Sequence, residues 1–442
     1  MAYLSEEALQ NLKKYTYKAV DKSILSKYVL NHLWNWFVTL WPLSVAPNTI
    51  TLSGLFIVFI NFLTLLYFDP SYVTEKGGAF VPNWVYFSWG IGLFLYQTFD
   101  SVDGKQARRT GMAGPLGQMF DHGCDAINTT LEAIIAAQAL NLGRSWWTLS
   151  SQLAALANFY LTTWEEYHTG YLYLGVFSGP VEGILMLVVV YLITGVYGPS
   201  FWDTPVLDFL HLSSVPLISN TIPNVGLNVC FMIFGAFGLA FNIIGSYSNV
   251  RTVMREKRER EEKSSSSSST TTEKPLIRLL PFLISAALQV AWVAHPPISS
   301  GSGPAEGGFT ILDSELFIPF LCAWGLQSAH RVGRIILAHL TRGSFPFWDP
   351  LWVLGLVGAV DANLPRLVGR PPIFQSTPAR TTLLIYTTLL LSFVAYARFC
   401  AGVINEITEF LGIACFTVRK KDGEGRWRSV IASEGEEEKK EK

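Results

Sequence analysis

Residues 100–125 read DSVDGKQARRTGMAGPLGQMFDHGCD and lie between long apolar stretches. An ionised aspartate near a bilayer is unfavourable, so such a residue usually faces a cavity, a partner or an ion. Asp100 and Asp103 are three residues apart and therefore project from one face of a helix. Asp121 and Asp125 are four apart and do the same on a second helix. Two such helices facing each other would build one cage of carboxylates.

A cage of this kind predicts a bound divalent cation. Carboxylate oxygens suit Mg²⁺, Mn²⁺ or Ca²⁺, and Mg²⁺ in particular is usually held by a few carboxylates together with substrate phosphates. The implied substrate therefore carries phosphate. Arg108 offers a forked set of donors that matches phosphate oxygens. Four nearby glycines leave room for close backbone approach: Gly104, Gly111, Gly114 and Gly117.

The spacing D-x2-D-G-x2-A-R-x8-G-x3-D-x3-D is the signature of the CDP-alcohol phosphatidyltransferase family. The chain resembles that family at every fixed position of the signature: Asp100, Asp103, Gly104, Ala107, Arg108, Gly117, Asp121 and Asp125. Within the family, the sequences DGKQARRT, FDHGCD, APNTITLSG (46–54) and WEEYHTG (164–170) resemble the eukaryotic, fungal-type choline and ethanolamine phosphotransferases.

This resemblance implies a membrane transferase. It would move phosphocholine or phosphoethanolamine from CDP-choline or CDP-ethanolamine to diacylglycerol, giving phosphatidylcholine or phosphatidylethanolamine and CMP. The resemblance also implies Mg²⁺ or Mn²⁺ at the four motif aspartates, a homodimer, and residence in the endoplasmic reticulum membrane, or alternatively in the Golgi. Two other hypotheses stay open: a family member that uses CDP-diacylglycerol as donor, and a transporter whose aspartates bind coupling ions.

The composition is that of a membrane protein. Of 442 residues, 50% are hydrophobic and only 15% charged, and the mean hydropathy is +0.31, which is too apolar for an ordinary soluble domain. The net charge of -1 singles out no class of partner, and we expect no nucleic-acid partner. The five cysteines are widely spaced, so they indicate neither a disulfide framework nor a zinc site.

We therefore predict an all-α, polytopic membrane protein. A spanning helix needs roughly 20 mostly apolar residues, and the candidate spans are 48–68, 82–102, 117–141, 146–166, 180–198, 222–248, 276–295, 311–340, 346–363 and 380–414. They divide the chain into an N-terminal interfacial segment (1–46), a six-helix catalytic core (47–250), a basic and Ser-rich cytosolic linker (251–275), a four-helix membrane block (276–414) and a charged cytosolic tail (415–442).

Basic residues predict the orientation, because Lys and Arg are in excess on the cytoplasmic side. With about ten spans, the basic N-terminal segment, the run 251–263 and the tail at 419–421 fall on one side. The aspartate motif then faces the cytosol, where a soluble nucleotide can reach it. Arg366, Arg370 and Arg380 disagree, since they lie in a predicted lumenal loop. Either that boundary is wrong or these side chains extend to lipid headgroups.

The N-terminal residues 5–27 predict an amphipathic helix. Ser5 is a plausible N-cap, and Leu9, Leu12 and Val20 alternate with lysines. We expect this helix to lie on the membrane surface, with a solvated terminal helix as the alternative.

His122 is the candidate general base for the reaction. The hydroxyl of diacylglycerol does not ionise at neutral pH, and histidine is the side chain whose usual pKa lies nearest neutrality. Asp125 is the rival base, and a purely structural His122 is the third alternative. Arg108 would share the charge neutralisation with the cation, whereas Lys105 would touch phosphate or simply face the cytosol.

Substrate recognition is expected at two further places. Asn48 begins the first span and resembles a family position that contacts the CDP moiety; its alternative role is a helix N-cap. The end of the fourth span would form an aromatic, acidic pocket for the choline or ethanolamine amine, built from Trp164, Glu165, Glu166, Tyr167 and His168. The alternative for this run is ordinary interfacial aromatic residues beside solvated glutamates.

Overall fold

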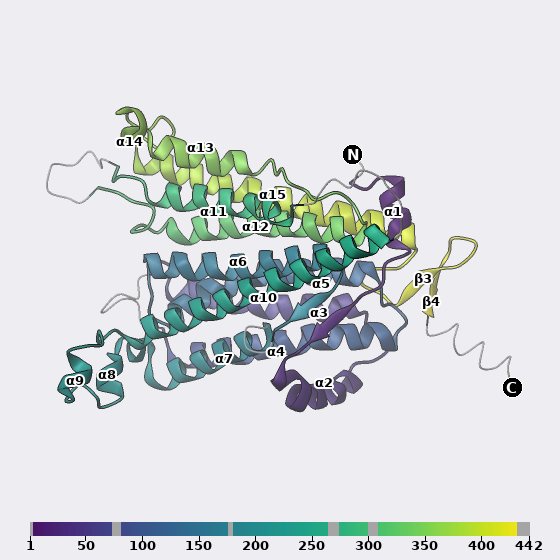
Figure 1. Cartoon of the computed structure of the whole chain (residues 1–442), viewed down its shortest axis with the longest axis horizontal. Helices are drawn as coiled ribbons and strands as arrows, with labels where there is room; N and C mark the ends of the chain where they lie inside the picture. The colour runs from purple at the N-terminus through teal and green to yellow at the C-terminus, as the bar shows by residue number, and fades with distance from the viewer. Residues whose placement is uncertain (1–2, 73–80, 176–179, 264–273, 299–307, 431–442) are drawn as a thin grey trace.

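A bundle of long helices makes up most of the chain (Figure 1). The computed structural model describes residues 3–72, 81–175, 180–263, 274–298 and 308–430. Its long helices are α3 (Pro47–Phe68), α4 (Asn83–Arg109), α5 (Pro115–Ala139), α6 (Trp146–Thr169), α7 (Pro180–Tyr197), α10 (Leu227–Lys263), α11 (Leu280–Val293), α12 (Phe317–Leu340), α13 (Trp352–Ala362) and α15 (Pro378–Leu411). Each of these helices underlies one of the predicted spans.

Among the described residues, four helices are long and apolar enough to cross a membrane: 47–68, 227–260, 275–293 and 378–411. The chain is therefore a multi-pass membrane protein, but ten spans are not confirmed. Several other long helices carry buried charged residues toward the interior, such as Asp103, Glu132, Glu166 and Arg331, and these lower their mean hydropathy. The helices α7 and α13 are apolar but shorter.

Short elements connect the long helices. The helical ones are α1 (Glu6–Leu12), α2 (Asn31–Phe37), α8 (Val206–Phe209), α9 (Pro216–Ser219), α14 (Leu364–Val368) and the single turns Ser26–Leu30, Val38–Leu40, Pro199–Asp203 and Pro275–Leu279. Strand β1 (Ala19–Asp21) pairs in parallel with β2 (Leu172–Leu174), and β3 (Arg419–Lys421) pairs antiparallel with β4 (Trp427–Ser429) to form a hairpin.

The bundle is built from two packed groups of helices. In the first, α4 lies against α3 and α7, and α6 lies against α5 and α10; in the second, α11 packs on α13 and α12 packs on α15 (Figure 1). Helix α12 joins the groups because it also packs on α5 and α6. Large aromatic side chains fill the interior, including the fully buried Trp89, Trp164, Trp292 and Trp324. One continuous apolar core therefore runs through both groups.

The N-terminal segment differs from the predicted helix over 5–27. Ser5 does cap a helix by accepting from the Ala8 amide, but α1 ends at Leu12, which is buried. The aromatic and β-branched residues after it favour extended backbone, and β1 pairs there with β2. Helix α1 is anchored on α15, because the amides of Tyr3 and Leu4 donate to the Glu406 carboxylate at 2.7 and 2.9 Å. The prediction of one helix over 5–27 is thus wrong, because α1 ends at Leu12 and β1 follows.

Two other predicted boundaries also shift. Helix α10 continues to Lys263, into the segment predicted to be a linker, while the Ser-rich tract 264–272 lies outside the described residues. The segment predicted to be a charged tail contains the β3–β4 hairpin.

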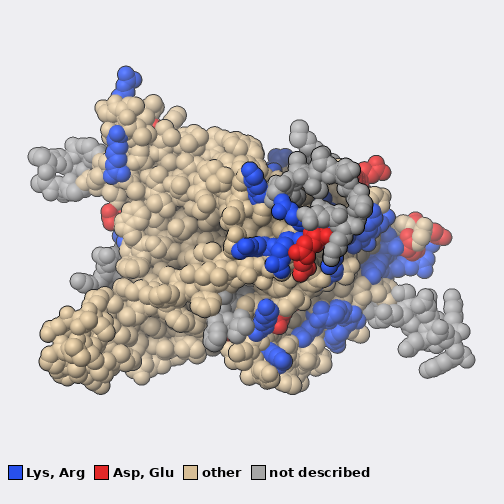
Figure 2. All heavy atoms as spheres, viewed as in Figure 1, with Lys and Arg blue, Asp and Glu red and all other residues tan. Residues whose placement is uncertain are grey.

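Charged side chains gather at one end of the bundle. Figure 2 shows Lys and Arg concentrated over the end that carries α1, α2 and the β3–β4 hairpin, while the middle of the molecule is almost free of charge on this face. We call this end, where residues 100–125 lie, the motif end, and the opposite end the far end. Arg366 lies at the far end, as the sequence predicts, and its guanidinium donates to the Ala294 carbonyl at 2.5 Å.

We predict that Gly325→Ala destabilises the bundle. A methyl group at Gly325 would overlap the Thr130 side chain, where α12 crosses α5. Overpacking costs about 1–3 kcal/mol, which exceeds the gain of up to about 1 kcal/mol in helix propensity. We therefore expect the Tm in detergent to fall by a few degrees. Gly235→Ala is the matched control, since Gly235 lies on the exposed face of α10 with nothing within 4 Å. Equal Tm values for the two variants would contradict the close crossing.

Candidate active site

The motif folds as an antiparallel helical hairpin. Helix α4 ends at Arg109 and α5 begins at Pro115, so the last turns of one face the first turns of the other. The connection reverses tightly because the Met112 amide donates to the Ala107 carbonyl at 2.8 Å. Gly111 has φ +63 there, in the left-handed region that glycine tolerates without strain. This turn places the aspartates of α4 opposite those of α5.

The four motif aspartates lie together. Asp100 interacts electrostatically with each of the other three, and Asp103 interacts with Asp121 and Asp125. Two further side chains orient the carboxylates: the Thr51 hydroxyl donates to Asp103, and the Tyr96 hydroxyl donates to Asp125 at 2.5 Å. Helices α3 and α4 therefore hold the cluster in place from the protein interior.

This cluster fits a divalent cation. Asp121, His122 and Asp125 offer ligand atoms that all lie within 4.8 Å of one another. Among the described residues, Asp121 Oδ1 and His122 Nδ1 are buried without a hydrogen-bond partner. Partly buried carboxylates at such close range repel one another unless a proton or a cation neutralises them. Hard oxygen donors in this number match Mg²⁺ or Mn²⁺.

His122 lies between two carboxylates. Its Nδ1 is 3.4 Å from Asp121 Oδ2, and its Nε2 is 3.9 Å from Glu166 Oε2. Glu166 is buried on α6 and accepts from the Gln118 amide at 2.7 Å. The Tyr15 hydroxyl in turn donates to Gln118. One nitrogen of His122 therefore faces the aspartates and the other faces a buried glutamate.

The three predicted substrate-binding residues near the motif differ in burial and in hydrogen-bond partners. Asn48 is buried at the start of α3, and its amide donates to Cys415 Sγ at 3.4 Å rather than capping the helix, so the N-cap alternative is wrong. Arg108 is exposed in the last turn of α4, beside Gly104. Lys105 turns away, because its ammonium donates to Asn35 Oδ1 at 2.8 Å. Asn48 thus lies beside the motif near Gly117, whereas the Lys105 ammonium is hydrogen-bonded to α2.

The structure does not bring Trp164 and Glu165 to the aspartates. The Trp164 indole donates to the Pro275 carbonyl at 3.0 Å. Glu165 accepts from Ser246 and Asn249 of α10, each at 2.6 Å. Successive residues of a helix point about 100° apart, so Glu166 faces the motif while its neighbours face other helices.

Sequence reasoning missed several residues that lie beside the motif: Tyr15, Thr51, Tyr96 and His339. His339 Nε2 lies 3.7 Å from Glu166 Oε1, and its ring meets Tyr15 edge to face at 5.9 Å. Glu166 was predicted as part of the amine pocket, but the sequence did not indicate that its side chain lies opposite His122. Tyr15 and His339 carry no local signal, because they reach the site from distant parts of the chain.

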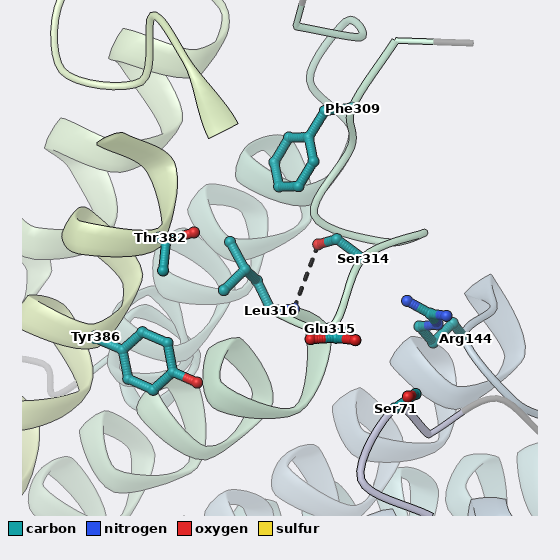
Figure 3. A pocket seen from close by; sticks show the side chains of 8 residues that line it. All are labelled: Ser71, Arg144, Phe309, Ser314, Glu315, Leu316, Thr382 and Tyr386. Atoms are coloured by element: carbon teal, nitrogen blue, oxygen red, sulfur yellow. Dashed lines mark hydrogen bonds between the residues drawn. The ribbon is translucent and has the colours of Figure 1, made fainter. Parts of the chain in front are cut away.

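A cavity that is separate from the motif lies at the far end. It has a volume of about 460 Å³ and is lined by residues that include Ser71, Arg144, Glu315 and Tyr386 (Figure 3). Arg144 donates to the Asp313 carbonyl at 2.8 Å on its rim. Ser71 follows the end of α3 whose start carries Asn48. With 1.5 Å per residue, a helix of this length keeps the cavity well apart from the motif.

Comparison with known proteins agrees with this site. The family model for CDP-alcohol phosphatidyltransferase matches residues 44–217. The chain is 37% identical to an uncharacterised CDP-alcohol phosphatidyltransferase class-I family protein of Schizosaccharomyces pombe, over 95% of this chain and 98% of that protein. It is 35% identical to choline/ethanolaminephosphotransferase 1 of Saccharomyces cerevisiae over 95% of this chain and 98% of that protein. It is 36% identical to cholinephosphotransferase 1 of the same yeast, over 94% and 98%.

The chain therefore belongs to the CDP-alcohol phosphatidyltransferase family. The similarity covers nearly the whole chain in these relatives, whereas the family model covers α3 to α9. The regions outside the family model include Tyr15, His339 and Cys415, which lie near the motif in space.

We predict that Asp121→Ala or Asp100→Ala weakens divalent cation binding. Loss of even an outer-shell partner typically lowers metal affinity about 10–100-fold, so loss of a ligand should lower it at least as much. Titration of the purified protein with Mn²⁺, followed by electron paramagnetic resonance, measures the change. Glu315→Ala in the far-end cavity is the control, and its affinity should match the wild type. Unchanged Mn²⁺ affinity in both aspartate variants would exclude this cluster as the metal site.

Proposed function

We propose that the protein transfers phosphocholine or phosphoethanolamine from CDP-choline or CDP-ethanolamine to diacylglycerol, releasing CMP. The observation that carries this proposal is the convergence of four aspartates beside a buried histidine. The chain is also similar over nearly its full length to the yeast choline/ethanolaminephosphotransferase 1 and cholinephosphotransferase 1. The alternative within the family, a CDP-diacylglycerol donor, has less support because the named relatives are choline and ethanolamine phosphotransferases.

The aspartates would hold the cation that binds the diphosphate end of the donor. When bound at Asp100, Asp103, Asp121 and Asp125, Mg²⁺ or Mn²⁺ supplies positive charge that neutralises the pyrophosphate and the departing CMP. Arg108 adds a guanidinium at the exposed edge of the motif. Thr51 and Tyr96 fix two carboxylates by hydrogen bonds, so the site is preorganised before the donor arrives.

His122 accepts the proton of the diacylglycerol hydroxyl. Its Nδ1 faces the aspartates and has no hydrogen-bond partner among the described residues, so it can receive the proton. Its Nε2 faces Glu166, whose carboxylate favours the imidazolium that forms. Asp125 is the weaker candidate for the base, because it already accepts from Tyr96. The deprotonated hydroxyl oxygen then attacks the phosphorus in line with the departing CMP.

The proposal also includes the orientation of the protein in the membrane, its location in the cell and its oligomeric state. The gathering of basic residues at the motif end supports a motif that faces the cytosol. Residence in the endoplasmic reticulum membrane and pairing as a homodimer rest on family resemblance. The far-end cavity takes no part in the transfer, since it lies at the opposite ends of the same helices.

The donor assay tests the function directly. Purified protein in diacylglycerol-containing micelles with Mg²⁺ should release CMP from CDP-choline and CDP-ethanolamine and form the matching phospholipid. CDP-diacylglycerol with inositol, serine or glycerol phosphate should give no product. Product only from CDP-diacylglycerol would establish the alternative donor, and ion flux without CMP release would establish a transporter.

Removal of the base should slow the chemical step. For His122→Ala we expect a roughly 10²–10⁴-fold fall in kcat, which is typical of losing a general base. Glu166→Gln keeps the size of the side chain and should lower kcat by a smaller factor without raising the KM for CDP-choline. Steady-state kinetics with both substrates varied makes the distinction. A full rate in His122→Ala would transfer the role of base to Asp125.

A further inference from the structure

The segment that follows α15 folds back onto the motif. Gly412 ends α15 in the left-handed conformation, and the chain then passes α3 and α5 before it enters the β3–β4 hairpin. Cys415 Sγ accepts from the Asn48 amide at 3.4 Å. Val418 is buried with Ala46 and Met112. This segment lies outside residues 44–217, which the family model matches.

Phe416 contacts the motif next to Asp121. Its ring meets the Phe120 ring edge to face, with centroids 5.4 Å apart, and Phe120 directly precedes Asp121. Phe416 nevertheless remains 50% exposed. An aromatic face is thus held beside the aspartate cluster and is still accessible to a ligand.

The geometry of the reaction decides which part of the donor lies here. In-line transfer places the attacking oxygen and the departing CMP on opposite sides of the phosphorus. On α5, Phe120 and His122 lie about 200° apart around the helix axis, on either side of Asp121. If His122 marks the side of the diacylglycerol hydroxyl, CMP leaves on the side of Phe120, Asn48 and Phe416.

We propose that the C-terminal segment Ile413–Val418 forms a wall of the nucleotide site, with the ring of Phe416 stacked on the cytosine of the donor. The inference rests on the proposed function and extends it to a residue that the family motif does not contain. Stacking on an aromatic face is a common way to hold a base. The basic hairpin that follows, with Arg419, Lys420 and Lys421, adds positive charge next to an anionic nucleotide.

Phe416→Ala tests this assignment. Stacking acts equally on the bound donor and in the transition state, so its loss should raise the KM for CDP-choline with little change in kcat. From the usual strength of base stacking we expect a rise of about 5- to 100-fold. The Kd of CMP, measured by calorimetry with Mg²⁺ present, should rise by a similar factor. The KM for diacylglycerol should not change.

Three companion variants make the test specific. Phe416→Leu keeps an apolar contact with Phe120 but lacks the aromatic face, so it should behave like Phe416→Ala. Phe416→Trp keeps the face and should bind CMP at least as tightly as the wild type. Trp427→Ala removes a half-exposed aromatic residue from the same hairpin, and its CMP affinity should equal that of the wild type.

The proposal is overturned if Phe416→Ala and Phe416→Leu bind CMP within about twofold of the wild type, which is less than a stacked base contributes. It is also overturned if Trp427→Ala weakens CMP binding as strongly as Phe416→Ala does, because the effect would then come from the folding of the hairpin. Calorimetry needs no turnover. A wild-type protein that binds CMP but does not release it from CDP-choline would refute the proposed function while leaving the role of Phe416 testable.

Discussion

The mutual repulsion of four carboxylates is the constraint on which the rest of the site depends. Asp100, Asp103, Asp121 and Asp125 interact with one another inside a helical bundle, where charge is poorly solvated. Such a cluster persists only if the surrounding fold imposes it and if positive charge neutralises it. The tight α4–α5 turn imposes the proximity, and under the proposed function a cation together with a phosphorylated substrate would provide the neutralisation. Binding would then be coupled to folding, since a ligand that binds only the folded state also stabilises it.

The same constraint accounts for the distant segments that converge on the motif end. Helix α1 and the β3–β4 hairpin, near the two ends of the described chain, both lie at the motif end of the bundle (Figure 1). Tyr15 reaches Gln118 from the N-terminal segment, and Cys415 reaches Asn48 from the C-terminal segment. Helix α1 is in turn held on α15 through Glu406. The second group of helices thus supports parts of the site that the family motif leaves out.

Much of the fold could be predicted from apolar stretches, because each predicted span contains a helix. What could not be predicted is how many of them cross the membrane. Hydropathy averages all faces of a helix, and helices such as α5 and α12 carry buried polar residues on one face, including Glu132 and Arg331. The prediction of a helix over 5–27 was wrong for a different reason. Its local pattern of leucines and lysines favours a helix, but pairing with β2 and anchoring on Glu406 are long-range contacts with no local signal.

The site shows the same division between local and long-range information. The spacing alone was enough to predict that the four aspartates lie together, because two helical faces and one turn determine their proximity. The spacing was not enough to predict whether Glu165 or Glu166 faces His122. Adjacent side chains point about 100° apart around a helix, and only packing decides which of them turns toward the motif. The Glu165 carboxylate accepts a hydrogen bond from Ser246 of α10, whereas the Glu166 carboxylate lies opposite His122. A motif therefore identifies the residues that share one helix hairpin, and the partners that orient them must be found in the folded chain.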